Sequence, residues 1–261
     1  MRVFLFRGLL VAIVAALAIC LYEMLIIQDT YVHEEQVHNA VLAYAPPTEA
    51  PKSLNAAKKA TAAWGSIAEN PGLPGGNQFI KDAQRNISDA VAAWLRVPNT
   101  CIDYPVVQGG DNSFYLNHDC MGQKSASGSL FVDSRNNAGF VDYNTVIYGH
   151  NMKNGSMFGE LGNFGNSIFF SNNPAASLYL SDCTYTLEIF AYLKVRQDDK
   201  YVYGSMQGAI FADFDAYVKS CALNYRDIGL ADSDRIVTLS TCANDNANSR
   251  TVVLARLERA D

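Results

Sequence analysis

The sequence has few cysteines, no C-x-x-C pair and no surplus of basic residues. Lys and Arg number 20 against 26 Asp and Glu, which gives a formal net charge of −6. A nucleic-acid-binding protein usually carries a basic face, so this balance argues against that class. Six cysteines among 261 residues are too sparse for a disulfide-dense miniprotein. Without a C-x-x-C pair, the common zinc-finger and thioredoxin signatures are also absent.

Composition excludes two further classes of protein. Hydrophobic residues make up 49% of the chain and charged residues 18%. A wholly disordered chain would be less apolar than this, and a polytopic membrane protein would carry several long apolar runs. The length suits one sizeable domain or two small ones.

One long apolar run stands at the N-terminus. Residues 1–27 are almost entirely apolar, and about 20 such residues cross a bilayer as a helix. Arg2 and Arg7 precede the run, and positive charge stays in the cytoplasm, so the rest of the chain should face outward. A cleaved signal peptide is the alternative, because residues 16–18 read Ala-Leu-Ala. The run continues to Ile27, which favours an uncleaved anchor.

Residues 28–76 differ from the chain on either side. They hold five of the eight prolines, and the Ala- and Lys-rich stretch at 55–65 could form a helix. Asn-Pro-Gly at 70–72 and Pro-Gly-Gly at 74–76 then break the chain. We interpret this segment as an extracellular spacer that separates the anchor from a folded domain over 77–261.

The domain is predicted to be mostly β. Ile87, Val91, Trp94 and Leu95 recur at helical spacing and predict an amphipathic helix over 79–96, which Pro98 ends. A second helix is expected near 207–221. Strand-like runs occupy 104–108, 129–133, 144–149, 184–195, 235–241 and 250–258. Because regular helices do not join these strands, a doubly wound parallel sheet is excluded.

The run 184–195 shows the clearest alternation. One face is predicted to carry Tyr185, Leu187, Ile189, Ala191, Leu193 and Val195. The opposite face then carries Thr186, Glu188, Tyr192 and Lys194, with Phe190 as an exception.

Three residues at strand ends could carry chemistry. His150 follows the strand-like run 144–149 and a Gly, and a strand terminus is a rigid place for a catalytic base. Cys242 ends another run before a polar loop, where a thiolate is nucleophilic if positive charge is near. Arg250 opens the next run and could supply that charge. The alternatives are a loop histidine and an inert core cysteine, but Cys with His is a nucleophile with its acid/base partner.

Neighbouring polar residues are candidates for substrate binding. Ser240 lies two residues before Cys242 and therefore faces the same side of a strand. Thr241 and Asn151 adjoin the two reactive residues. The triplet His118-Asp119-Cys120 could suggest a metal cluster, but adjacent strand residues point to opposite faces, so neither a metal nor a cofactor is expected.

Several segments, in this order, resemble those of class B sortases. They are Ile-Asp-Tyr-Pro-Val-Val-Gln at 102–108, Phe-Tyr-Leu-Asn-His-Asp at 114–119, Gly-Ser-Leu-Phe-Val-Asp at 128–133, Gly-His-Asn-Met at 149–152 with Gly-Ser-Met-Phe at 155–158, and Leu-Ser-Thr-Cys at 239–242 with Arg250. The resemblance extends over about 86–258. It implies a closed β-barrel of about eight strands with inserted helices, the one at 207–221 lying in the loop before the Cys strand.

The resemblance also implies an activity. Cys242 would attack the Thr carbonyl of a C-terminal sorting signal on a secreted protein, Arg250 would stabilise the oxyanion, and His150 would protonate the leaving amine. An amine of a cell-wall precursor would then resolve the thioester. The alternatives are a sortase that polymerises pilins and a cysteine peptidase that hydrolyses the same bond. A non-catalytic surface module is a further class, against which the intact set of three residues argues.

The sequence departs from the family pattern in two places. Class B sortases often carry an acid two residues after the Cys, where this chain has Asn244 followed by Asp245. Many relatives have a His at the position of Leu254, which we do not regard as catalytic. Four further cysteines could form disulfides at an oxidising surface: Cys101, Cys120, Cys183 and Cys221. Sequence alone leaves three pairings open, and Cys242 is expected to stay unpaired.

Overall fold

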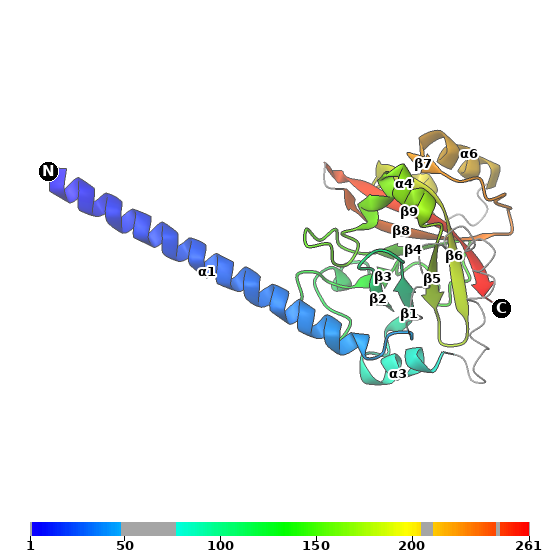
Figure 1. The fold of residues 1–261 in the computed structure, drawn as a ribbon, viewed down its shortest axis with the longest axis horizontal. Coiled ribbons are helices and arrows are strands. Elements are labelled where there is room, and N and C mark those ends of the chain that lie inside the picture. Colours follow the sequence, from blue (N-terminus) through cyan, green and yellow to red (C-terminus); the bar gives the residue numbers. More distant parts are fainter. Residues whose placement is uncertain (1, 48–76, 205–210, 244–245, 261) are drawn as a thin grey trace. The chain divides into compact units, whose positions relative to one another are not determined.

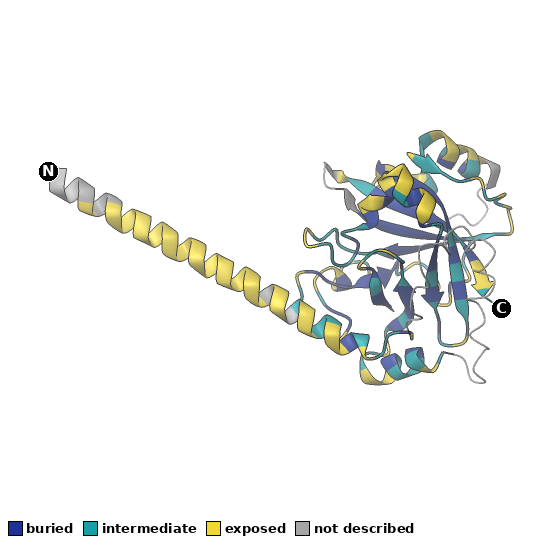
Figure 2. Ribbon diagram, in the orientation of Figure 1, coloured by how far each residue is buried: buried dark blue, intermediate teal, exposed yellow. Residues whose placement is uncertain are grey.

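The computed structural model describes residues 2–47, 77–204, 211–243 and 246–260. The possible helix at 55–65 lies outside them. The chain divides into two units, Met1–Ala40 and Val41–Asp261. The first unit belongs to α1 (Arg2–Leu42), a helix of 41 residues, and most of its described residues are exposed (Figure 2).

Helix α1 continues beyond the anchor expected from sequence. It passes Ile27 and ends at Leu42. Its span Leu10–Leu42 is long and apolar enough to cross a membrane, judged by length and composition alone. The large apolar side chains from Leu10 to Val32 are exposed, which a bilayer would accommodate and water would not.

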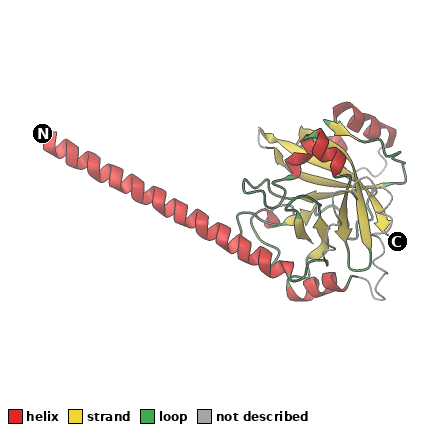
Figure 3. Cartoon of the chain, in the orientation of Figure 1, coloured by secondary structure: helices red, strands yellow, loops and turns green. Residues whose placement is uncertain are grey.

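The second unit is a closed β-barrel (Figures 1 and 3). Nine strands follow the order β5-β1-β2-β3-β4-β8-β9-β6-β7, and β5 also pairs with β6. That extra pairing closes eight strands and leaves the two-residue β7 at one side, as the expected eight-stranded barrel requires. The strands are β1 (Val91–Arg96), β2 (Asp103–Gln108), β3 (Leu130–Val132), β4 (Asn144–Tyr148), β5 (Ala175–Tyr179), β6 (Thr184–Arg196), β7 (Asn224–Tyr225), β8 (Arg235–Ala243) and β9 (Asn246–Ala260).

Short helices lie between the strands. The 3-10 turn η2 (Phe114–Leu116) precedes β3, and η3 (Leu161–Gly165) and α4 (Ser167–Asn172) lie between β4 and β5. Helices α5 (Lys200–Tyr203) and α6 (Phe211–Cys221) follow β6, so the predicted helix near 207–221 is present over α6.

The predicted helix over 79–96 is wrong in its second half. Helix α3 (Gln78–Asn86) ends early, and the following residues form β1, which pairs with both β2 and β5. Trp94 and Leu95 are fully buried in that strand. Their apolar run fits a strand covered on both faces as well as a helix stripe, and barrel closure selects the strand.

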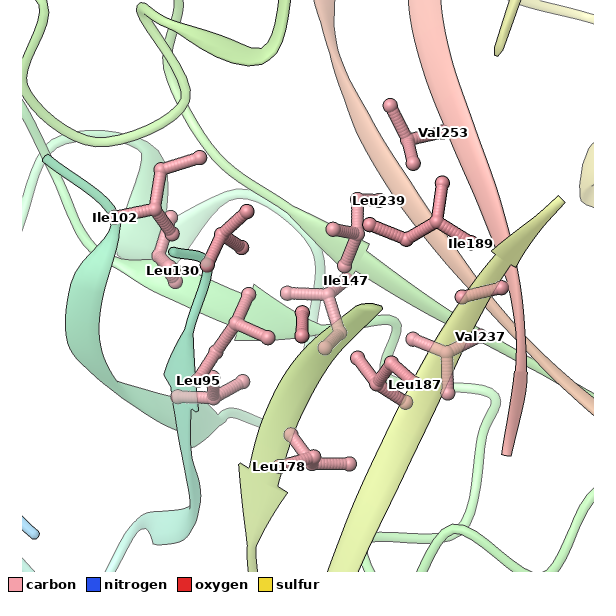
Figure 4. Packing of buried hydrophobic residues seen from close by; sticks show 14 of the residues in the cluster. Leu95, Ile102, Leu130, Ile147, Leu178, Leu187, Ile189, Val237, Leu239 and Val253 are labelled. Carbon is pink, nitrogen blue, oxygen red and sulfur yellow. The ribbon is translucent and has the colours of Figure 1, made fainter. Parts of the chain in front are cut away.

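All eight barrel strands contribute apolar side chains to one core, part of which is shown in Figure 4. Leu95 comes from β1, Leu130 from β3, Ile147 from β4, Leu187 from β6 and Leu239 from β8. Because every closing strand contributes, this cluster is the interior of the barrel.

A second apolar cluster covers part of the outer surface. It joins Val202 of α5 and Phe214 of α6 to Ile236 of β8, Leu254 of β9 and Leu193 of β6. Two short helices therefore pack over the outer face of β6, β8 and β9. The family position at Leu254 is fully buried here, in agreement with its exclusion as a catalytic residue.

The predicted alternation along β6 is correct only up to Ile189. The register with β9 shifts between Ile189 and Ala191, which marks a β-bulge at Phe190. The bulge adds one residue, so Tyr192 joins the barrel core whereas Ala191, Leu193 and Val195 join the outer cluster. The exception at Phe190 in the sequence pattern is this bulge.

Candidate active site

Cys242 and Arg250 are paired across β8 and β9. The antiparallel register matches the Cα of Cys242 with that of Arg250. Directly opposite positions of an antiparallel pair belong to the same face of the sheet. The backbone of Cys242 is described, and its side chain lies outside the described part of the chain.

His150 reaches the same level through the parallel pairing of β4 with β8. Tyr148 pairs with Ser240, and the amide of Gly149 donates to the Ser240 carbonyl at 3.2 Å. His150 follows Tyr148 by two residues, as Cys242 follows Ser240. The registers place Tyr148 beside Ser240 and Cys242 opposite Arg250, and His150 follows two residues after the last paired residue of β4. We call the three positions His150, Cys242 and Arg250, at this end of the three strands, the row.

This row belongs to the outer face of the barrel. Ile236, Val252 and Leu254 pack in the outer cluster, whereas Leu239 and Val253 pack in the interior. Even-numbered positions of β8 and β9 therefore face outward, since strand residues alternate. The expected common side for Ser240 and Cys242 follows from the same alternation.

The ring of His150 is oriented by a backbone carbonyl. Its Nε2 lies 2.6 Å from the carbonyl oxygen of Leu116 in η2. A carbonyl oxygen only accepts hydrogen bonds, so Nε2 carries a proton. This leaves Nδ1 as the ring nitrogen that can take up and release a proton during a reaction.

The guanidinium of Arg250 is held by the segment that follows β6. Its Nη2 donates to Gln197 Oε1 at 2.9 Å, and its Nη1 donates to the Ser249 carbonyl at 3.1 Å. Arg250 is half-buried and stays charged at any physiological pH. A fixed cation beside a nucleophile suits the negative charge that develops on an acyl oxygen.

The three candidate substrate-binding residues differ in their placement. Ser240 is buried, and its Oγ lies 2.8 Å from the Tyr203 hydroxyl of α5. Thr241 pairs with Thr251 and is 3% exposed, and its position faces the barrel interior, so the fold does not bring it to the row of reactive residues. Asn151 forms a β-bridge with Met157 directly after His150.

Four residues that the sequence did not indicate as site residues form a connected set next to the row: Asp133, Arg135, Tyr148 and Tyr203. The Tyr148 hydroxyl donates to Asp133 Oδ2 at 3.1 Å, and Arg135 donates to both carboxylate oxygens of Asp133. Burial alone would raise the pKa of Asp133, but the hydrogen bonds from Arg135 outweigh it and lower the pKa to about 2. The rings of Tyr148 and Tyr203 stack at 6.2 Å.

The triplet His118-Asp119-Cys120 forms no metal site. His118 stacks on Phe114, and its Nδ1 contacts the carbonyl of that residue at 2.8 Å. The Asp119 carboxylate accepts from the amides of Met121 and Gln123. Among the residues that the structure describes, no cluster of His, Cys, Asp or Glu could hold a metal ion.

The cysteines outside the row are unpaired. Cys101, Cys120, Cys183 and Cys221 are all free thiols in the structure. Burial raises the pKa of the Cys120 thiol to about 12, so it is a poor nucleophile at neutral pH. The departures from the family pattern at positions 244 and 245 lie outside the described residues.

Comparisons with known proteins agree with the fold. The family profile of the sortase domain matches residues 95–258. Sortase B of Listeria monocytogenes is 36% identical over 181 residues, which cover 68% of this chain and 73% of that protein. Both ends of the row fall within the matched region.

Solved structures of sortases are also similar to this chain. Sortase B of Clostridium perfringens is similar with a TM-score of 0.63 and 39% identity, covering 68% of this chain and 98% of that one. A class B sortase of Streptococcus pyogenes involved in pilus biogenesis has a TM-score of 0.64 and 34% identity, covering 68% of this chain and 97% of that one.

Proposed function

Because this chain belongs to the class B sortases, we propose that it is a membrane-anchored cysteine transpeptidase. It cleaves a C-terminal sorting signal after Thr and transfers the protein to an amine of the cell wall. The observation that carries the proposal is the pairing of Cys242 with Arg250 across β8 and β9, with His150 just beyond the end of the neighbouring strand β4. A nucleophile, a proton carrier and a fixed cation are the groups that acyl transfer requires.

In the first half-reaction, the Cys242 thiolate attacks the Thr carbonyl carbon and the carbonyl π bond becomes a C–O⁻ bond. Arg250 stabilises this oxyanion. As the C–N bond breaks, His150 gives its Nδ1 proton to the leaving amine. A thioester on Cys242 and a free C-terminal peptide result.

In the second half-reaction, an acceptor amine attacks the thioester. His150 takes the proton from the attacking nitrogen, and the C–S bond breaks to regenerate the thiolate. One amide bond has been exchanged for another, so no external energy source is needed. Water is the competing nucleophile, and its reaction would make the enzyme a peptidase.

The N-terminal helix supports a location at the cell surface. The span Leu10–Leu42 can cross a membrane, and Arg2 and Arg7 precede it. Retention of these charges in the cytoplasm would leave the barrel outside the cell, where secreted substrates and wall precursors meet, and this supports the proposal. The proposed enzyme therefore belongs to a Gram-positive cell surface and passes the membrane once.

Polymerisation of pilins is a second candidate function. The pilus-associated sortase of Streptococcus pyogenes is 34% identical to this chain. In that reaction a Lys side chain of a pilin replaces the wall amine as the acceptor. The residues of the row serve both reactions equally, so only the acceptor separates them.

The test uses the full chain in detergent micelles and a library of sorting pentapeptides, including the Asn-Pro-x-Thr type. Reactions are run with triglycine, with a pilin-derived Lys peptide and without an amine. Intact mass spectrometry of the protein and of the peptides is recorded together. The Cys242→Ala variant is the matched control, because it removes only the thiol.

A Cys242-dependent acyl adduct that triglycine converts into a ligated peptide is the expected result. Preferential ligation to the Lys peptide would support the pilin reaction instead. Cleavage at the same rate with and without amines would favour the peptidase. Cleavage by Cys242→Ala at the wild-type rate would overturn the assignment of the nucleophile.

A further inference from the structure

We propose that Asp133 and Arg135 are positioning residues that keep the residues of the row in their active geometry. Asp133 holds the side chain of Tyr148, two residues before His150, and Arg135 holds helix α5, which contacts the strand of Cys242. The proposal deepens the proposed function, on which its activity readout rests. A second readout, described below, does not depend on that function.

Asp133 connects two parts of the site from a buried position. It follows β3 directly and its side chain is 1% exposed. Arg135 donates to it from the backbone amide at 2.9 Å, from Nε at 3.0 Å and from Nη2 at 2.7 Å. The remaining capacity of Oδ2 is used by the Tyr148 hydroxyl at 3.1 Å. Such a carboxylate is saturated with donors, so its geometry is fixed.

The first set of contacts connects Asp133 to the segment that carries His150. Tyr148 is the last residue of β4 and lies two positions before His150. Its hydroxyl is tied to Asp133 and its ring stacks on that of Tyr203. The end of β4 is therefore fixed through its side chain as well as through its pairing with β8.

The second set of contacts connects Arg135 to β8, the strand that carries Cys242. Arg135 Nη2 donates to the carbonyl of Tyr203 at 3.2 Å. The Tyr203 hydroxyl in turn lies 2.8 Å from Ser240 Oγ, and Ser240 is two positions before Cys242. The Asp133–Arg135 ion pair is thus connected through Tyr203, the last residue of α5, to Ser240 on the outer face of β8.

Other contacts hold α5 in the fold when this pair is weakened. Asn144 Nδ2 donates to the Val202 carbonyl at 2.9 Å, and the Thr238 hydroxyl donates to Asn144 Oδ1 at 2.7 Å. Val202 is also fully buried in the outer cluster. Loss of the Asp133 charge should therefore shift α5 and Tyr148 rather than unfold the barrel, and a misplacement near 1 Å can cost about a hundredfold in rate.

The key variants are Asp133→Asn, Tyr203→Phe and their combination. Asp133→Asn removes the charge at constant size, and Tyr203→Phe removes the hydroxyl while keeping the ring. Asp198→Asn is the matched control, because Arg196 holds Asp198 with the same two-residue spacing, through Nε at 2.9 Å and Nη2 at 2.9 Å. That control pair is exposed on both sides.

Steady-state kinetics with a sorting peptide and triglycine give kcat and KM for each variant. Asp133→Asn should lower kcat/KM by about tenfold to a hundredfold, and Asp198→Asn should stay within about twofold. Arg135→Lys should fall between them, because it keeps the charge but not the planar fork.

The double variant separates positioning from general stability. If Asp133 acts through α5, removing the Tyr203 hydroxyl should cost less in the Asp133→Asn background than in the wild type. Additive losses would show that the two residues act independently and would overturn the coupling. Equal kcat/KM for Asp133→Asn and Asp198→Asn would overturn the proposal as a whole.

Hydrogen exchange provides the readout that does not need turnover. The amides of Tyr203 and Gly204 close α5 by donating to Asp199 and Lys200. Their exchange should be faster in Asp133→Asn and unchanged in Asp198→Asn. If the wild type forms no adduct with any peptide, the proposed function fails while this result still supports or refutes the fastening of α5.

Discussion

Cys242 lies directly opposite Arg250 in the antiparallel ladder of β8 and β9. The pairing is a property of the two backbones, so it does not depend on how a loop is arranged. Sites built on regular elements hold their geometry better than sites built on loops. His150 lies two residues after the end of β4, whose last residue Tyr148 pairs with Ser240 of β8.

Replacing Arg250 by Lys should lower kcat/KM for a sorting peptide by about a hundredfold or more. Lysine keeps the charge but loses the planar fork that lets Arg250 contact Gln197 and the Ser249 carbonyl together. Arg259→Lys is the control, because Arg259 is exposed on the same strand. Wild-type activity in Arg250→Lys would show that charge alone suffices there.

Replacing Cys242 by Ala should abolish the acyl adduct and leave the melting temperature close to that of the wild type. The thiol is the proposed nucleophile, and the fold does not require it as a disulfide partner. Cys101→Ala should remain active, because Cys101 is an exposed free thiol. Intact mass and differential scanning fluorimetry on the same samples make the comparison. An adduct on the Cys242→Ala protein would place the nucleophile elsewhere.

Replacing Gly149 by Ala should both destabilise the barrel and impair His150. A Cβ at this position would lie 2.4 Å from Leu130 Cδ2 and 2.8 Å from Phe158 Cδ2. Overpacking of a core costs about 1–3 kcal/mol in unfolding free energy, and the displaced chain carries His150, the proposed proton carrier. Urea unfolding and peptide cleavage measure the two effects.

Gly162→Ala provides the comparison for that experiment. A Cβ at Gly162 meets no atom within 4 Å, so its unfolding free energy and activity should match the wild type. Equal stability of both variants would mean that the space around Gly149 can open without cost.

Acid should remove a stabilising contribution that belongs to Asp133. Its pKa falls from 3.8 to about 2 in the folded protein. Because the pKa of Asp133 is lower in the folded than in the unfolded protein, its carboxylate stabilises the fold at any pH above the unfolded-state pKa. This contribution is lost as the pH falls from about 4 towards 2. It amounts to about 2 kcal/mol at neutral pH. Urea unfolding across this window should show a smaller pH dependence for Asp133→Asn. An identical dependence in both proteins would contradict the assignment.

Local pattern predicted most strands correctly and indicated candidate site residues. The runs containing β2, β3, β4, β6, β8 and β9 all carry alternation or compact apolar stretches with turn residues beside them. His150, Cys242 and Arg250 were identified because each stands where such a run begins or ends. The strand order could not be read locally, since β4 and β8 are separated by more than eighty residues of chain.

Errors arose where tertiary structure decides between two local readings. Val91, Trp94 and Leu95 satisfy a helix stripe and a fully buried strand equally, and only the pairing of β1 with β2 and β5 selects the strand. The bulge at Phe190 reverses the faces of β6. In the sequence pattern, Phe190 is a single exception to the alternation. The pattern does not show that the residues of β6 after Phe190 face the opposite side of the sheet from the one it predicts.

The supporting polar residues could not be predicted from spacing. Asp133 and Arg135 form a local pair that the sequence allows, but their partners Tyr148 and Tyr203 come from a different strand and from a helix beyond the barrel. Nothing in the local sequence indicates that these four residues meet. Only the closed barrel brings the end of β3, the end of β4 and α5 together.

The parallel pairing of β4 with β8 has a consequence for how such an enzyme can change its substrates. Parallel neighbours cannot be joined by a tight turn, so the chain must travel back along the barrel between His150 and Cys242. Helices α4, α5 and α6 all lie within this return path. Insertions and replacements there can change the surface around the row, while the ladder of β8 and β9 keeps Cys242 opposite Arg250. Among these helices α5 is the exception, because its Tyr203 contacts Ser240 on β8.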